Sequence, residues 1–295
     1  MVIIIIDKSK SLGDDLTMNS SFVLFNFQTW FSGFRQKFYK WFTAEGVEYL
    51  DQSTYMYKPM HIAIILSVLA LTLIVFFAFR KKSEQSQRNF LIGIAVLMIT
   101  CEIFTRISKL LFHADLGVLT LEQVIKDILP IHFCSVMIWV LIFAVLFDKR
   151  SLLSFGAVCG LIGCAVYLAY PIEGLDHSFF NIRMLNSPLT HGLGFVVCMN
   201  LFLWGFVHLD IKDIWKTYIL LSCMVIYGGI MNILLPGENY MFIVTNPTPI
   251  NTGKIPYQIP FVLVAILIVA LIYLTPYWIG KLRNKRRNKK ATQNI

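Results

Sequence analysis

The sequence predicts an all-α protein, a polytopic membrane bundle of about seven transmembrane helices. Hydrophobic residues make up 57% of the 295-residue chain and charged residues only 15%, which excludes a water-soluble domain. Crossing a hydrocarbon core of about 30 Å takes roughly 20 helical residues. Backbone polar groups must be paired within the segment in lipid, which favours helices over strands. Seven stretches meet this length: 60–79, 90–112, 129–147, 151–170, 189–207, 214–235 and 257–280.

The first part of the chain, residues 1–58, is an N-terminal extension that differs from the rest. Aromatic and aliphatic residues over 22–31 lead into Arg35, Lys37 and Lys40. This mixture suits an amphipathic helix in the membrane interface, although a helix packed on the rim of the bundle would have the same composition. Met18 is an alternative start, which would remove the first 17 residues.

Basic residues mark one end of the predicted spans in the transmembrane domain, residues 59–280. They cluster at 80–82 with Arg88, at 149–150, at Lys212 with Lys216, and in the tail 281–295. The positive-inside rule places these clusters in the cytoplasm, together with the C-terminus of a multi-pass protein of the cell membrane. The net charge of +9 then reflects contact with anionic lipid rather than with nucleic acid.

The six cysteines all lie inside predicted spans and show no paired spacing. Neither a disulfide framework nor a zinc site is indicated, and no cofactor is predicted. Most of the thiols are expected to pack in the core. Cys134 is the exception, because its neighbours are polar.

Ionisable residues open two of the predicted spans. His132 and Cys134 begin the third span, and His191 begins the fifth. Such side chains are costly in a bilayer and usually face the interior of the bundle, where they act. In the second span, Glu102 and Arg106 follow the i, i+4 spacing that places them on one helix face. We therefore expect these groups to gather at a similar depth.

Helical geometry separates the first two of these residues. His132 and Cys134 are two positions apart, about 200° around a helix, so only one of them is expected to react. The end of the sixth span adds amides and a phenol, and the predicted substrate-binding residues are Glu102, Arg106, Asn232, Asn239 and Tyr240. His61, His113, His177 and His208 lie at span ends or in loops and receive no role.

A thiol and histidines at one depth suit acyl transfer, in which a thiolate attacks a carbonyl and a histidine moves protons. Cys134 or His132 is the candidate nucleophile or its partner, with His191 as general base. Arginine and asparagine nearby would stabilise the developing charge. Structural roles stay open as well: a packing thiol, a histidine bonded between helices, a structural ion pair, and a turn at residues 239–240.

These residues resemble a known family. The Pro130-x-His132-x-Cys134 opening, the His191-Gly192 opening and the Asn-Tyr-Met-Phe sequence at 239–242 look like the YwaF-like integral membrane family. Its animal branch contains membrane acyltransferases acting on phospholipids. The resemblance implies paired histidines at 132 and 191 and a cysteine beside the first as acyl acceptor. The animal branch is expected to carry that cysteine directly before the histidine, where this chain has Ile131.

The predicted function is that of an enzyme moving fatty acyl groups onto or between phospholipids, with membrane lipids as its partners. A small-molecule permease or substrate-binding subunit is the main alternative. The lack of an internal repeat and of an evident broken helix weighs against it. A non-catalytic scaffold, in which the histidines bond helices together, is the third interpretation.

Overall fold

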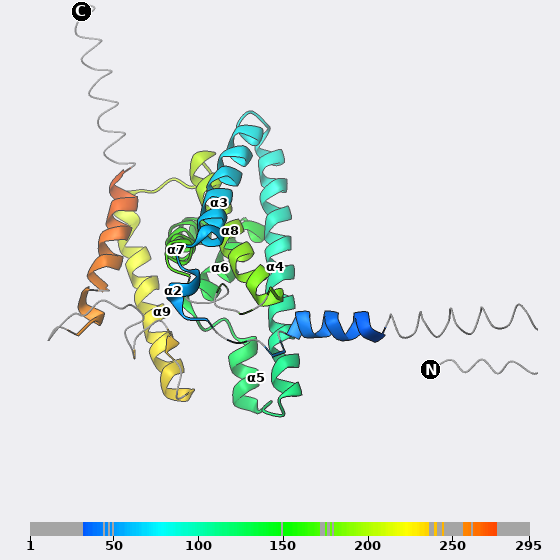
Figure 1. Ribbon diagram of the computed structural model, residues 1–295. Coiled ribbons are helices and arrows are strands. Elements are labelled where there is room, and N and C mark those ends of the chain that lie inside the picture. Colours follow the sequence, from blue (N-terminus) through cyan, green and yellow to red (C-terminus); the bar gives the residue numbers. More distant parts are fainter. Residues whose placement is uncertain are drawn as a thin grey trace, which may run out of the picture.

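A computed structural model shows the fold (Figure 1). It describes residues 32–43, 45–46, 48, 50–148, 150–171, 175, 178, 180–235, 239–240, 244, 256–260 and 262–275. Within these residues the regular structure is entirely helical, which confirms the predicted all-α class. The alternative start at Met18 and the basic tail 281–295 lie outside the described residues.

The helices follow the predicted spans closely in position. They are α2 (Gln52–Tyr55), α3 (Pro59–Phe79), α4 (Glu84–Asp115), α5 (Leu121–Ile128), α6 (Phe133–Phe147), α7 (Arg150–Ala169), α8 (Ile182–Leu203), the 3-10 turn η1 (Ile211–Asp213) and α9 (Ile214–Leu234). Helical residues also occur at 32–43 before α2, and at 258–260 and 262–275 after α9.

Five of these helices, rather than seven, are long and apolar enough to cross a membrane, or six if one bent pair counts as a span. They are α3, α4, α7, α9 with its preceding turn, and Gln258–Thr275. The helix α8 falls short because polar residues such as Arg183, Asn186 and His191 lower its hydropathy. The described residues therefore support a multi-pass membrane protein, with five or six candidate spans among them.

The third predicted span is broken. Its residues 129–132 precede α6, and α6 is bent by 55° relative to α5, the short helix that comes before the predicted span. Leu129 is extended with φ −76° and ψ 139°, as expected for a residue before proline. Pro130 thus ends α5, and α6 starts afresh after His132. The expectation of one unbroken helix over 129–147 was wrong, because α6 begins only at Phe133, and α5 is a separate helix between the second and third predicted spans.

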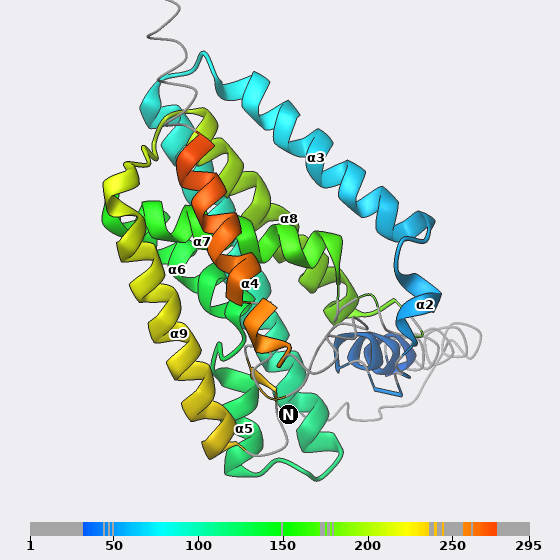
Figure 2. The same ribbon diagram turned by 90° about the vertical axis from the view of Figure 1, so that its left-hand side faces the viewer.

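The core of the described bundle is formed by α6, α7 and α8, with buried residues added by α4 and α3 (Figures 1 and 2). Small residues allow the closest approaches. A Cβ atom on Gly160 of α7 would lie 3.0 Å from the Sγ of Cys198 in α8, and one on Gly194 of α8 would lie 2.7 Å from the Sγ of Cys164. The thiols therefore pack where the two helices meet.

Gly194→Ala is expected to destabilise the protein by about 1–3 kcal/mol, because its Cβ has no room beside the buried thiol of Cys164. Gly93→Ala is the matched control in α4, since a Cβ there meets nothing within 4 Å. That control should be neutral or stabilising by up to about 1 kcal/mol. Thermal unfolding in detergent measures both variants, and equal unfolding temperatures would contradict the close packing of α7 against α8.

Candidate functional site

His191 lies on α8, one turn after its internal proline. Its Nδ1 is 2.7 Å from the carbonyl oxygen of Ser187. Because a carbonyl only accepts hydrogen bonds, Nδ1 carries the proton and donates it. In the neutral ring Nε2 is then the basic nitrogen, the form that a general base needs. The ring stacks on Tyr167 of α7, with 3.8 Å between the ring centroids.

Cys134 packs against the same part of α7. It lies in the first turn of α6, and its thiol donates to the carbonyl oxygen of Gly163 at 3.8 Å. Gly163 and Tyr167 are one helical turn apart. One turn of α7 therefore contacts both the predicted nucleophile from α6 and the predicted base from α8.

His132 has a different neighbour. It is the N-terminal cap residue of α6, with an extended backbone, and its carbonyl oxygen accepts from the Val136 amide at 3.0 Å. Its ring meets the edge of Tyr240 at a centroid distance of 5.1 Å. Cys134 contacts α7, so the two residues have different partners, although His132 is extended and the helical separation assumed from the sequence does not apply to it.

The side-chain amide of Asn232 holds the backbone of Tyr240 in place. Its Nδ2 donates to the Tyr240 carbonyl at 3.0 Å, and its Oδ1 accepts from the Tyr240 amide at 2.7 Å. The Tyr240 side chain is buried with Ile131. Asn239 accepts from the Val244 amide at 2.9 Å. The end of α9 and residues 239–240 thereby form one wall beside His132.

Glu102 and Arg106 form an ion pair in the bundle. Their charged atoms are 3.0 Å apart, and their side chains are only 10% and 16% exposed, respectively. The guanidinium lies over the ring of Trp139 in α6, 5.7 Å from its centroid. The pair therefore lies on α4 where that helix packs against α6, the helix that carries Cys134.

A buried amide anchors α8 to α4 close to this pair. Asn186 donates to the carbonyl of Cys101 at 3.2 Å and to the hydroxyl of Thr105 at 2.9 Å. The sequence analysis did not single out this residue, because an asparagine in an apolar helix gives no sign of its partner. Its contacts fix the start of α8, which carries His191 one turn further on.

Two histidines without a predicted role have defined partners. His61 is 1% exposed, accepts from the Tyr57 amide at 3.0 Å and lies 2.8 Å from the carbonyl of Leu168, so it serves the packing of α3 on α7. His113 pairs with the buried carboxylate of Asp127 at 2.7 Å, which joins α4 to α5. This pair spans a hairpin that the sequence analysis treated as a loop. His177 lies outside the described residues.

The described residues contain no group of three or more histidine, cysteine or acidic side chains that could hold a metal ion. All six cysteines are free thiols. The chemistry supported by the described site is therefore that of a thiol, imidazoles and one buried ion pair.

Comparison with known protein families identifies a match to the transmembrane part of the chain. The model of the TMEM164 family matches residues 55–276, a range that includes α3 to α9 and every candidate site residue. It excludes the helix at 32–43. No curated protein and no solved structure matches the chain.

Proposed function

The chain belongs to the TMEM164 family of transmembrane proteins, and on that premise we propose that it moves a fatty acyl group onto or between phospholipids. The observation that supports this most directly is the turn of α7 at 163–167, which contacts Cys134 on one neighbouring helix and His191 on another. The likeness of their motifs to YwaF-like proteins supports the same substrate class.

The proposed reaction has two steps. The Cys134 thiolate attacks the ester carbonyl of a phospholipid, so that a C–S bond forms and the C–O bond of the ester breaks. The departing alkoxide takes up the proton that the thiol lost, which yields a lysophospholipid. The hydroxyl of an acceptor lipid then attacks the thioester and gives its proton to Nε2 of His191, and the thiolate leaves.

The other site residues act around this centre in the proposal. Arg106 lies in the layer beside α6 and supplies positive charge toward the phosphate or the oxyanion. Asn232 is engaged with the Tyr240 backbone, so it acts by positioning Tyr240 against His132. Its contribution to substrate binding is thus indirect.

Acyl trapping tests the nucleophile. The purified chain in lipid is incubated with an alkyne-tagged phospholipid, and the covalent label is released with hydroxylamine. We expect a hydroxylamine-sensitive label on the wild type that disappears in Cys134→Ala. Cys223→Ala is the matched control, because that thiol is exposed and belongs to α9. A label that persists in folded Cys134→Ala would exclude this cysteine, and absence of both label and transferred product would contradict acyl transfer altogether.

A permease is the second candidate, and one observation favours it. The 55° break between α5 and α6 places irregular backbone at residues 129–132, and broken helices of this kind form substrate sites in many transporters. A solute that raises the unfolding temperature of the protein, with no lipid product formed, would support this function instead.

A further inference from the structure

The helix at 32–43 lies outside the family match and runs across α4 rather than along it (Figures 1 and 2). One of its faces carries a row of aromatic rings. Phe34 stacks on Phe38 at 6.2 Å between centroids, and Phe38 stacks on Phe42 at 6.0 Å. Phe34 and Phe38 are nevertheless 53% and 51% exposed. Large aromatic side chains exposed to this extent and in one row mark a surface that meets an apolar environment.

The level at which this helix meets α4 matches the edge of a bilayer. The exposed ion pair Arg88–Asp148 marks the aqueous boundary at the other end of α4. Ser108 donates to the carbonyl of Phe42 and holds the helix in place. From Arg88 to Ser108 is 20 residues, or about 30 Å of helix, which equals the thickness of the hydrocarbon core.

Two faces of the helix contact α4 at two different depths. The rings of Phe42 and Phe104 meet edge-on, with 6.0 Å between their centroids. On α4, Phe104 lies four residues closer to Arg88 than Ser108 does. The carboxylate of Asp115, seven residues beyond Ser108 on the other side, is near enough to Tyr39 to be the main reason why the pKa of its phenol is raised. The aromatic face thus points toward the hydrocarbon level and the tyrosine toward water.

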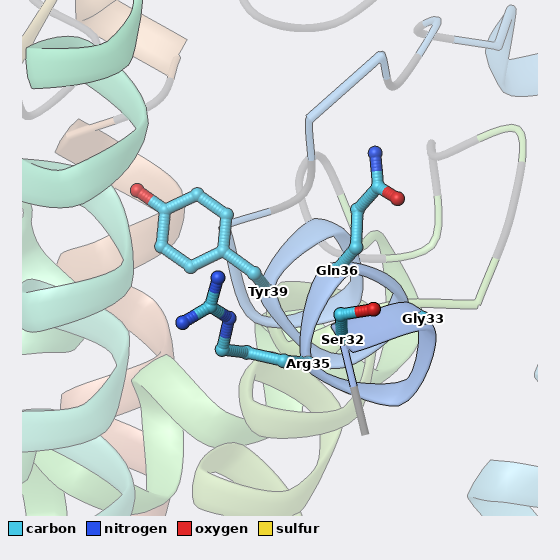
Figure 3. A pocket seen from close by; sticks show the side chains of 5 residues that line it. All are labelled: Ser32, Gly33, Arg35, Gln36 and Tyr39. Carbon is cyan, nitrogen blue, oxygen red and sulfur yellow. The ribbon is translucent and has the colours of Figure 1, made fainter. Parts of the chain in front are cut away.

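The remaining side chains are polar or basic. Arg35, Lys37 and Lys40 are all exposed, and no acidic residue lies within 32–43. A hollow of about 630 Å³ is lined by Ser32, Gly33, Arg35, Gln36 and Tyr39. Arg35 and Tyr39 extend to the same side of the helix, and Gln36 points away from them (Figure 3).

We propose that residues 32–43 form an in-plane anchor that inserts Phe34 and Phe38 among the acyl chains of one leaflet and binds anionic phospholipid headgroups through its basic residues. Three observations carry this: the orientation of the helix relative to α4, its level one hydrocarbon thickness from Arg88, and a row of exposed aromatic rings with basic residues beside it and behind it. The anchor does not depend on the proposed acyl transfer.

Photo-crosslinking in lipid nanodiscs tests the anchor. The full chain carries p-benzoylphenylalanine in place of Phe38, or in place of Gln36 as the matched control on the opposite side of the helix. After illumination, mass spectrometry identifies the adducts. We expect several-fold more acyl-chain adducts from position 38 than from position 36. In nanodiscs of mixed neutral and anionic phospholipid, Lys37→Gln with Lys40→Gln should lower the anionic share of those adducts.

If something other than lipid covers the aromatic row of this helix, the crosslinking gives a different result. Adducts from position 38 to a second copy of the chain would show a protein interface and overturn the proposal. Equal lipid adducts at positions 36 and 38 would overturn the assigned orientation of the two faces. A variant with p-benzoylphenylalanine in place of Phe34, one turn away, repeats the measurement. A folding defect caused by the probe at position 38 therefore does not decide the outcome.

Discussion

Replacing His191 with glutamine is expected to lower the rate of acyl transfer by about 10²- to 10⁴-fold, the usual contribution of a general base. The glutamine amide can still donate to the carbonyl of Ser187 and pack against Tyr167, so the helix interface should persist. It cannot accept the proton of the attacking hydroxyl. Transfer from a tagged phospholipid to a lysophospholipid acceptor, measured in nanodiscs, reports the rate.

The matched control is His208→Gln, at an exposed histidine beyond the end of α8. It should transfer acyl groups at the wild-type rate. If His191→Gln were fully active, the assignment of the base would be wrong. If it instead unfolded while remaining active per folded molecule, His191 would be a residue that bonds helices together, as in the scaffold interpretation.

Arg106→Leu is expected to cost about 3–5 kcal/mol of unfolding free energy, because it leaves Glu102 buried without its cation. The two side chains are too little exposed for water to replace the lost partner. Denaturant unfolding in micelles measures the loss. The matched control is Arg88→Leu, which removes the exposed pair with Asp148 and should cost no more than about 1 kcal/mol.

The double variant Glu102→Leu with Arg106→Leu separates stability from function. Removing both charges should restore most of the stability, since buried ion pairs are often replaceable by apolar residues. If Arg106 serves the substrate, the stable double variant will still transfer acyl groups poorly. Wild-type activity in that variant would make the pair purely structural.

Much of the candidate site could be located from the sequence, but not its contacts. The polar residues in apolar stretches were visible, but the extended backbone of His132 was not, so the helical spacing assumed for His132 and Cys134 does not describe their arrangement. The partners of His191 and Cys134 were not predictable, because Tyr167 and Gly163 lie on another helix and have no local signal. The pairing of His113 with Asp127 was also missed, since it requires the hairpin between α4 and α5.

The sequence by itself determined the class of the protein. Long apolar stretches can satisfy their backbone in lipid only as helices, so composition and length alone predict a multi-pass helical bundle. The helix boundaries were less well determined, since α8 begins at Ile182 rather than at 189 and α6 at Phe133 rather than at 129. The tertiary structure decided which polar groups meet: the break at Pro130, the packing of α8 through Gly194, and the turn of α7 shared by Cys134 and His191. The break follows from the local effect of Pro130 on the residue before it, whereas the other two depend on contacts between residues distant in the chain, about which a periodic apolar pattern carries no information.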